Sequence, residues 1–514
     1  MFEKWIRWVL LCGLFACATD ERARRDQADQ HADRSALEKD AGVGSPPAQP
    51  PSTRQDPHAP MPVASAVVDA GAASESGAAS DAGAASEAYP GKGFIVHEWG
   101  TNTVVVSSDG KLQRGMHHEE EDLPAFVHDR LGQGEFLSSP SVDKMETPVD
   151  YFYSDQPLTA NVSVAMPNGL LTQWYPAVRE FAPSILEGAF GRAEKVDPHL
   201  ELGLPFESQR CIDKFTPLAG GRLDWGQVEI LARGGAIAPA LPEAPLERFT
   251  WSYARDVAAN PIRVKNPSGQ SLDGLPVLGP QSERFLFYRG LGNFALPVDV
   301  VEWGSDPTSV GVKLTNRSPW PTEGPVFVLD VGSDTGAFRQ FAGALSPSAE
   351  LTAALSSGAE ALPLDRFVDA LDVAMTSALL GTGLYRDEAV AMVRTWRRQW
   401  FRTPGVRVLY FAPAAWIDRE VPLSISPAPD TLLRVMVLRV ELLRRTTEDE
   451  DLKFAAGLDG GANQAIGERH FRALGRFAEP RLRRALELLG AMPPGAASFL
   501  AAIEHPSASF APGE

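Results

Sequence analysis

Hydrophobic patterning in this chain begins abruptly at residues 94–106, a run rich in β-branched and aromatic residues. Such a composition is typical of a β-strand. Asp109-Gly110, which follows, is a turn signal that predicts a hairpin. His97 and Glu98 lie inside the apolar run, so the segment is either part of an active centre or an unusually polar core strand. Strand alternation would place these two side chains on opposite faces.

Residues 17–92, which precede this run, have the composition of a linker. They contain a proline cluster at 46–51, and the sequence Asp-Ala-Gly-Ala-Ala-Ser-Glu at 69–75 recurs at 81–87. Too few large apolar side chains are present to offset the entropy cost of ordering the backbone. We predict a disordered tether of roughly 75 residues with a random-coil span on the order of 50 Å.

The first residues have the features of an export signal. Lys4 and Arg7 precede a short apolar run at 8–16, which is too short for a permanent transmembrane helix. The tetrapeptide Leu-Phe-Ala-Cys at 14–17 resembles a bacterial lipobox. This resemblance implies a signal peptide of residues 1–16 and a lipid on Cys17.

The residue after Cys17 bears on localisation. Ala18, rather than aspartate, stands there, and the lipobox resemblance then implies sorting to the bacterial outer membrane. The N-terminal lipid would make the membrane a partner of the protein, because several buried acyl chains give stable anchoring. The alternative is ordinary signal-peptide cleavage nearby, with Cys17 unmodified.

Charge and cysteine content exclude several functions. The net charge is −18, and an acidic protein repels phosphate backbones, so we expect no nucleic-acid partner. If Cys12 leaves with the signal and Cys17 is acylated, only Cys211 remains in the body. One thiol cannot form an internal disulfide, a multi-cysteine zinc site or an iron–sulfur cluster. An envelope protein or a glycan remains as the expected ligand class.

The first half of the body carries short strand patterns separated by proline and glycine. Those patterns, together with two near the C-terminus, lie at 149–153, 160–165, 227–231, 284–288, 310–314, 326–330, 406–411 and 433–440. We predict a mixed α+β fold whose β-rich body is sandwich-like or a large mixed sheet. The predicted domains are 93–344, which is β-rich, and 345–492, an α/β region packed on it. A flexible tail at 493–514 follows.

Helical spacing of apolar residues appears in the C-terminal half. The predicted helices lie at 346–355, 364–379, 387–401, 468–474 and 479–489. Trp396 and Trp400 share one face, which is typical of a core stripe, although a binding platform is the alternative. Thr447 followed by Glu450 predicts a capping box at a helix start.

Several short motifs together resemble an uncharacterised family of exported bacterial proteins. They are His-Glu-Trp-Gly-Thr at 97–101, Lys-Met-Glu-Thr-Pro-Val at 144–149, Trp-Tyr-Pro at 174–176, Phe-Leu-Phe-Tyr-Arg-Gly at 285–290, Ala-Met-Val at 391–393 with Thr-Trp at 395–396, and Gly-Arg-Phe at 475–477. The resemblance covers most of residues 93–480 and brings no activity with it. Asn102 stands where the family has an aromatic residue, and Gln173 where it has a glutamate.

A divalent metal site is one enzymatic hypothesis. Four of the nine histidines lie between 97 and 128, beside the acidic run 119–122, and histidine with carboxylate can bind zinc, manganese or iron. His97, His117 and His118 are the candidate ligands. A two-residue turn at 109–110 would leave His118 roughly 13 Å from His97 along the hairpin at about 3.3 Å per residue, which weakens the hypothesis.

A pair of carboxylates for glycoside hydrolysis is the second enzymatic hypothesis. Glu98 and Glu146 both lie in apolar or aromatic stretches, where burial would raise one pKa and create a general acid. The alternative is that both accept hydrogen bonds in the core or pair with Lys144 or Arg179. No triad elbow, phosphate loop or dinucleotide motif is present in the sequence.

The sequence therefore favours a cell-envelope lipoprotein that acts as a binding or structural module. The alternative is a hydrolase acting on polysaccharide or peptide, with a site around His97, Glu98 and Glu146. No cofactor is predicted apart from a divalent metal ion as the minority hypothesis.

The lipid anchor can be tested directly. We expect Cys17→Ser to abolish metabolic labelling with a fatty-acid analogue and to release the protein from membranes, because the acylated thiol is lost. Labelling retained in the Cys17→Ser protein would contradict the anchor, and Cys211→Ser should leave labelling unchanged.

Overall fold

A ten-stranded mixed sheet is built around β1 (Phe94–Val106). The computed structural model describes residues 88–119, 123–124, 126–129, 141–183, 218–234, 250–265, 280–304, 309–356 and 360–504. β1 pairs in parallel with β19 (Thr431–Leu442) and antiparallel with β3 (Asp143–Ser154). Because it has a neighbour on each side and layers above and below, every residue of β1 except Ile95 is buried.

The strand order of the large sheet is β16-β14-β13-β17-β19-β1-β3-β10-β5-β2. Its remaining strands are β2 (His128–Asp129), β5 (Gly169–Tyr175), β10 (Leu286–Gly292), β13 (Val326–Val331), β14 (Thr335–Phe341), β16 (Leu362–Pro363) and β17 (Gly405–Phe411). β17 and β19 follow residue 345 in the chain, yet they lie between β13 and β1. The large sheet therefore takes strands from both predicted regions, 93–344 and 345–492.

Two smaller sheets cover one face of the large sheet. One has the order β18 (Leu423–Ser426), β4 (Leu158–Met166), β7 (Gly221–Ile230), β8 (Ile262–Val264) and β9 (Gln281–Glu283), with β6 (Glu180–Ala182) also paired to β7. The other is β11 (Val298–Glu302), β12 (Ser309–Asn316) and β15 (Glu350–Ser356). Alternate residues of β4 and β7 join those of β1 and β3 in one apolar core.

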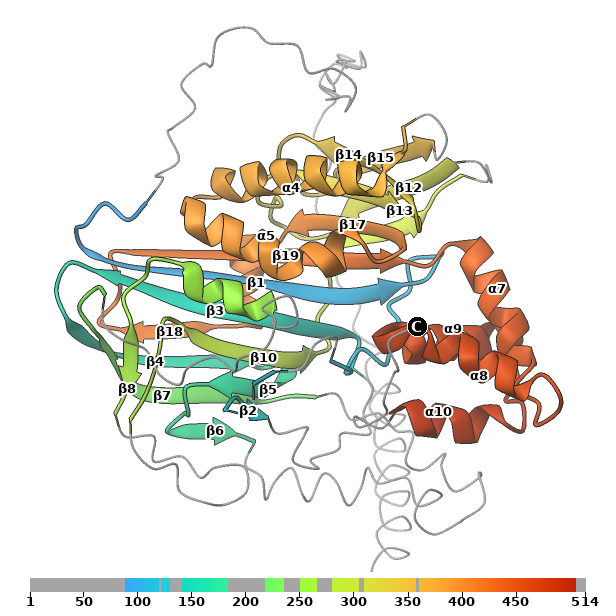
Figure 1. Ribbon diagram of the computed structural model, residues 1–514, viewed down its shortest axis with the longest axis horizontal. Coiled ribbons are helices and arrows are strands. Elements are labelled where there is room, and N and C mark those ends of the chain that lie inside the picture. Colours follow the sequence, from blue (N-terminus) through green and yellow to red (C-terminus); the bar gives the residue numbers. More distant parts are fainter. Residues whose placement is uncertain are drawn as a thin grey trace, which may run out of the picture. The chain divides into compact units, whose positions relative to one another are not determined.

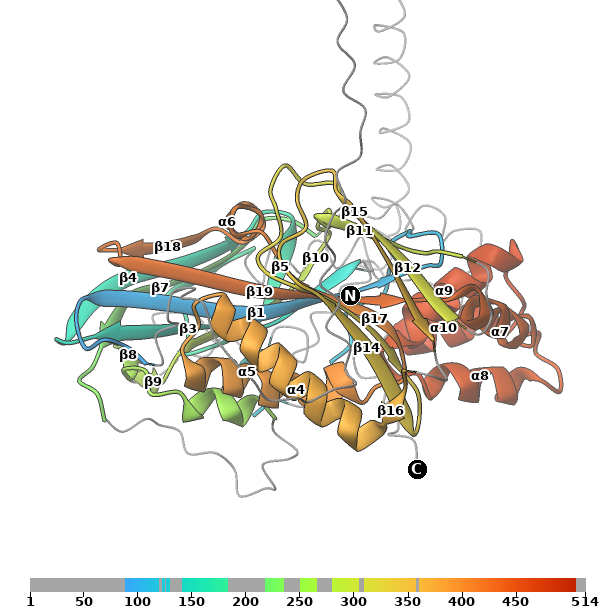
Figure 2. The same cartoon turned by 90° about the horizontal axis from the view of Figure 1, so that it is seen from above.

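Helices cover the opposite face. α4 (Leu364–Gly381), α5 (Arg386–Phe401) and the 3₁₀ helix η3 (Thr250–Asp256) contribute to a second core with the other face of β1 and β3. In Figure 2, α4 and α5 lie on one side of β1 and β19, and β4, β7 and β18 lie on the other. Trp396 and Trp400 are buried and stacked with ring centroids 6.2 Å apart, as predicted for a core stripe.

A helical group near one end of the large sheet completes the body (Figure 1). It comprises α7 (Arg445–Ala456), α8 (Gln464–Arg472), the 3₁₀ helix η4 (Gly475–Phe477), α9 (Ala478–Leu489) and α10 (Ala496–Glu504). These helices share a separate apolar core. A short helix, α6 (Ala414–Glu420), connects β17 to β18. None of the helices among the described residues is both long and apolar enough to cross a lipid bilayer.

The mixed α+β class, with a β-rich body and helices concentrated in the C-terminal half, is confirmed. Three local predictions are wrong. The segment predicted as a helix at 346–355 contains β15, the predicted tail contains α10, and α7 begins at Arg445 rather than at Thr447. In α10, Phe499 and Ile503 are held by the core of the helical group. The signal, Cys17, most of the linker and Cys211 lie outside the described residues.

An irregularity in β1 and β3 explains the glycine of the His-Glu-Trp-Gly-Thr motif. The β1–β3 register shifts between Trp99 and Thr101, and Thr147 opposite has a φ of 51°. A Cβ on Gly100 would lie 3.0 Å from the Pro148 Cα. A side chain at this position would therefore force the two strands slightly apart. Such bulges re-aim the side chains that follow them.

We expect Gly100→Ala to destabilise the body by about 1–3 kcal/mol, because the added methyl group must displace backbone. Urea denaturation would measure the change. Gly381→Ala is the control, since a Cβ at Gly381 meets nothing within 4 Å. Equal stability of the two variants would contradict this account of the bulge.

Candidate functional site

His97 lies on the helix-covered face of the large sheet and binds the start of α5. Its Nδ1 donates to the Glu388 carboxylate, at 2.9 Å from Oε2. The same carboxylate accepts hydrogen bonds from the Tyr153 hydroxyl at 2.7 Å and from the Tyr385 backbone N–H at 2.7 Å. All four residues are buried. His97 thus satisfies a buried carboxylate that caps α5 and holds the helix on the sheet.

Glu98 points to the opposite face, as alternation predicts. Its carboxylate accepts from the Tyr288 hydroxyl and pairs with the Arg434 guanidinium. Asp150 stands opposite Glu98 in the β1–β3 register and is fully buried. Burial and the neighbouring Glu98 charge raise the pKa of Asp150 well above its ordinary value, and Arg434 offsets this only in part. The pair therefore retains a proton that an exposed aspartate would lose.

Glu146 faces the helical group. Its carboxylate accepts from Arg476 Nη1 at 2.6 Å and from Thr103 Oγ1 at 2.9 Å. Burial alone would raise the pKa of Glu146, but Arg476 and Lys144 outweigh it and hold the pKa below its ordinary value. Arg179, an expected partner, instead pairs with Asp224 at 2.5 Å.

The structure does not bring His97, Glu98 and Glu146 together. Glu98 shares its face with Val96 and Phe152 of the two-sheet core, whereas Glu146 shares the other face with His97. Glu146 stands opposite Thr101 and His97 opposite Tyr151, which separates them by roughly 13 Å at about 3.3 Å per residue. Glu98 and Glu146 therefore cannot act as a carboxylate pair across one glycosidic bond.

Residues from three separate motifs, at 144–149, 285–290 and 475–477, meet in one polar network on this face. Lys144 Nζ lies 2.7 Å from Glu119 Oε1, and Arg289 Nη1 lies 2.7 Å from Glu119 Oε2. Arg476 forms an ion pair with Glu146. Burial lowers the pKa of Lys144 despite the nearby Glu119 and Glu146 carboxylates. Gln173 is buried opposite Arg289 in the β5–β10 register.

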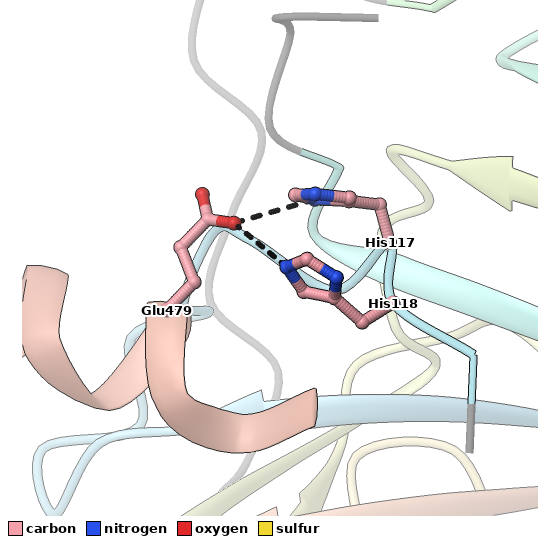
Figure 3. Close-up of side chains that lie close together, drawn as sticks. All are labelled: His117, His118 and Glu479. Atoms are coloured by element: carbon pink, nitrogen blue, oxygen red, sulfur yellow. Dashed lines mark ion pairs between the residues drawn. The ribbon is translucent and has the colours of Figure 1, made fainter. Parts of the chain in front are cut away.

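His117 and His118 adjoin this network. Lys144 Nζ donates to their backbone carbonyls at 3.1 and 3.0 Å. His117 Nδ1 and His118 Nε2 lie 3.4 and 3.8 Å from Glu479 Oε2 of α9, and Figure 3 shows both rings directed at this carboxylate. Burial lowers the pKa of His117, although Glu479 opposes the shift. Of the three histidines considered as metal ligands, His117 and His118 are therefore together and His97 lies apart.

The chain after β1 does not form the long hairpin that the sequence predicts. After β1 only Val106 and Leu112 form a bridge, and the chain then leaves the sheet in a loop. His117 and His118 lie in this loop rather than in a strand, so adjacent rings can face the same way. Nothing in the sequence links them to Glu479, which comes from the other end of the chain.

A cleft of about 510 Å³ lies where the sheet meets the helical group. Its walls come from the ends of β1, β13 and β19, from residues 403–406, and from α7, η4 and α9. β1 and β19 are parallel, so both present their carboxyl ends there. The polar lining residues are Asp330, Thr403, Glu441, Arg444, Thr446, Thr447, Glu450 and Arg481.

Most charged groups in the cleft are already paired. Glu441 accepts from Arg439 Nε at 2.6 Å and also pairs with Arg407, and these arginines hold its pKa below the ordinary value against the effect of burial. Arg481 Nε lies 2.7 Å from Asp451, and Arg444 lies beside Glu302 at 3.5 Å.

Asp330 is different, as is the exposed Glu450, because its side chain has no hydrogen bond or ion pair within the described ranges, and Arg444 is the only charge that acts on it there. Burial raises its pKa, and Arg444 opposes the shift. This carboxylate is therefore available to a ligand.

No protein-family model matches the chain, and no curated protein matches it either. The chain is similar to two solved structures of the yeast delta-COP-I mu-homology domain, one in complex with a Dsl1 WxWxV peptide. The TM-scores are 0.23 for the complex and 0.22 for the other, with 9% and 8% identity, covering 68% of this chain and 97% of those chains. Red sea bream transglutaminase matches at a TM-score of 0.12 and 10% identity, covering 58% of this chain and 29% of that one. These likenesses are too distant to support an argument about fold or function.

The Glu98–Asp150 pair gives a pH-dependent expectation. Between the ordinary aspartate pKa and the raised folded-state pKa, the folded protein binds a proton that the unfolded chain has lost, so stability falls as pH rises. We expect Asp150→Asn, which removes the second charge, to increase the free energy of unfolding more at about pH 7.5 than at about pH 4.5. Urea denaturation at both pH values would measure this. An equal effect at the two values would contradict a shared proton.

Proposed function

We propose that this protein is a lipid-anchored protein of the bacterial cell envelope whose body is a ligand-binding module. The observation that carries the binding role is the cleft of about 510 Å³ at the carboxyl ends of β1 and β19. Its volume is within the range of small-molecule sites. The anchor rests on the lipobox resemblance at Cys17, and the tether would let the body reach ligands away from the membrane.

The position of the cleft supports this role. In open parallel α/β sheets, ligands bind beyond the carboxyl ends of the strands, and the parallel pair of this mainly antiparallel sheet, β1 and β19, ends at the cleft. Here β1 leads into the loop that carries His117, and β19 leads into α7. The cleft is therefore walled by the sheet edge on one side and by the helical group on the other.

The free groups of the cleft define the ligand class. Its two arginines are engaged by Glu302 and Asp451, whereas Asp330 and Glu450 have no such partner in the described parts of the chain. Carboxylates accept hydrogen bonds only, so the ligand must donate them, and a cationic donor gains most. The negative net charge of the protein also favours a cation.

An amino sugar combines these properties. Its ammonium group would pair with Asp330, and its hydroxyl groups would bind Glu450 and the cleft threonines. A soluble amino sugar also belongs to one of the two ligand classes, envelope protein and glycan, that the sequence leaves open. The proposal is therefore binding of an amine-bearing sugar with Asp330 as the charge partner.

The hydrolase alternative has no comparable support. Glu98 and Glu146 lie on opposite faces of one sheet, and each is held by a buried arginine, Arg434 or Arg476. A binding role requires none of these residues to react with a substrate.

We expect glucosamine to bind more tightly than glucose, because only the amine can pair with Asp330. Asp330→Asn should weaken glucosamine binding by about 10-fold or more, in line with loss of a charged hydrogen bond, and should leave glucose binding little changed. Titration followed by NMR or calorimetry would measure both.

Asp334→Asn is the matched control, because Asp334 is exposed and lies outside the cleft lining. Equal binding of the two sugars, or unchanged glucosamine binding by Asp330→Asn, would contradict the proposal.

A further inference from the structure

We propose that His117, His118 and Glu479 bind a divalent transition-metal ion, best matched by zinc. The three side chains are 7%, 3% and 0% exposed, respectively. One donor atom from each lies within 4.8 Å of the others, and Figure 3 shows the two imidazoles converging on one carboxylate oxygen. This site is independent of the sugar ligand proposed above.

The spacing of the donors fits a metal ion. Metal bonds of about 2.1 Å in a tetrahedral zinc site place neighbouring ligand atoms roughly 3.4 Å apart. Glu479 Oε2 lies 3.4 Å from His117 Nδ1 and 3.8 Å from His118 Nε2. Small movements of buried side chains would therefore complete the coordination.

The tautomer of His117 explains why a cation would be stable between His117 and Glu479. Its Nε2 lies 2.8 Å from the Glu504 backbone carbonyl, which can only accept, so Nε2 carries the proton. The lone pair of Nδ1 then faces Glu479 Oε2, and neither atom has a hydrogen bond among the described residues. Two acceptors that face each other in a buried site repel, and a cation between them removes the repulsion.

The second oxygen of Glu479 is already fixed. Oε1 accepts from Arg483 Nε at 2.7 Å, and Arg483 also pairs with the Glu504 carboxylate. Oε2 is thereby directed at the histidines. Contacts of this kind, together with the Glu504 carbonyl on His117, are the supports that orient metal ligands.

The loop that carries the histidines is shaped around Glu479. Gly115 has a φ of 107°, and a Cβ there would lie 2.6 Å from the Glu479 side chain. Lys144 fixes the loop through the carbonyls of His117 and His118, and its charge is balanced by Glu119 at 2.7 Å. Both cations near the site, Lys144 and Arg483, are paired with carboxylates, which reduces their repulsion of a further cation.

The donor set selects the ion. Two imidazole nitrogens and one carboxylate suit zinc and similar transition metals, whereas calcium and magnesium prefer oxygen ligands. Three protein ligands leave a fourth position for water. The ion would join the middle of the loop after β1 to α9, adding to the Asp109–Arg484 and Lys111–Glu487 ion pairs that link the start of this loop to the same helix.

The test is metal uptake by the full chain. After removal of metal with a chelator, we expect one equivalent of zinc to bind and to raise Tm. Cobalt(II) in its place should give the visible absorption of a tetrahedral nitrogen and oxygen site. Glu479→Gln and His118→Ala should each weaken zinc binding by at least about 100-fold, because a direct ligand is lost.

His470→Ala is the matched control, because His470 lies in the same helical group and pairs with Asp451 at 2.7 Å. It should bind zinc like the unaltered protein. Circular dichroism would verify folding of each variant, and the cobalt spectrum of the unaltered chain tests the site even if a variant unfolds. Absence of zinc uptake, or uptake undiminished in both Glu479→Gln and His118→Ala, would overturn the proposal.

Discussion

The fold depends on β1 being buried on both faces while it carries polar side chains. A buried donor or acceptor without a partner costs about 1–3 kcal/mol, so a polar side chain of β1 gains stability where a group from another element meets it. His97 is met by Glu388 of α5, Glu98 by Arg434 of β19, and Thr103 by Glu146 of β3. The partners arrive from across the chain, and the strand therefore ties the two layers and the large sheet together.

The bulge at Gly100 divides β1 into two functional parts. Before the bulge, His97 binds Glu388 of α5 and Glu98 binds Arg434 of β19. After it, the same face turns to the helical group, where Glu146 and Arg476 form a buried ion pair. Breaking such a pair by removing one partner is strongly destabilising, because it leaves a buried charge. The Lys-Met-Glu-Thr-Pro-Val and Gly-Arg-Phe motifs therefore act as one unit, although they lie far apart in sequence.

Much of the framework could be predicted from local pattern. β1, α4 and α5 have strong periodicity and were placed within a few residues. β15 was missed because its alanine- and leucine-rich sequence favours a helix, while pairing with β12 buries Ala353 and Leu355 in a strand. Opposite faces for His97 and Glu98 followed from alternation alone. Glu479 and the cleft could not be predicted, since they depend on elements that meet only after the long-range sheet has formed.

The helical group takes part in both proposed sites. η4 and α9 form a wall of the cleft, and α9 also carries Glu479 of the proposed metal site. Hydrogen–deuterium exchange of the full chain, with zinc alone and with glucosamine alone, tests this most directly. We expect zinc to protect amides in the loop at 113–119 and in α9, and glucosamine to protect those around β13 and the start of α7. Protection by both ligands elsewhere, or by neither, would contradict it.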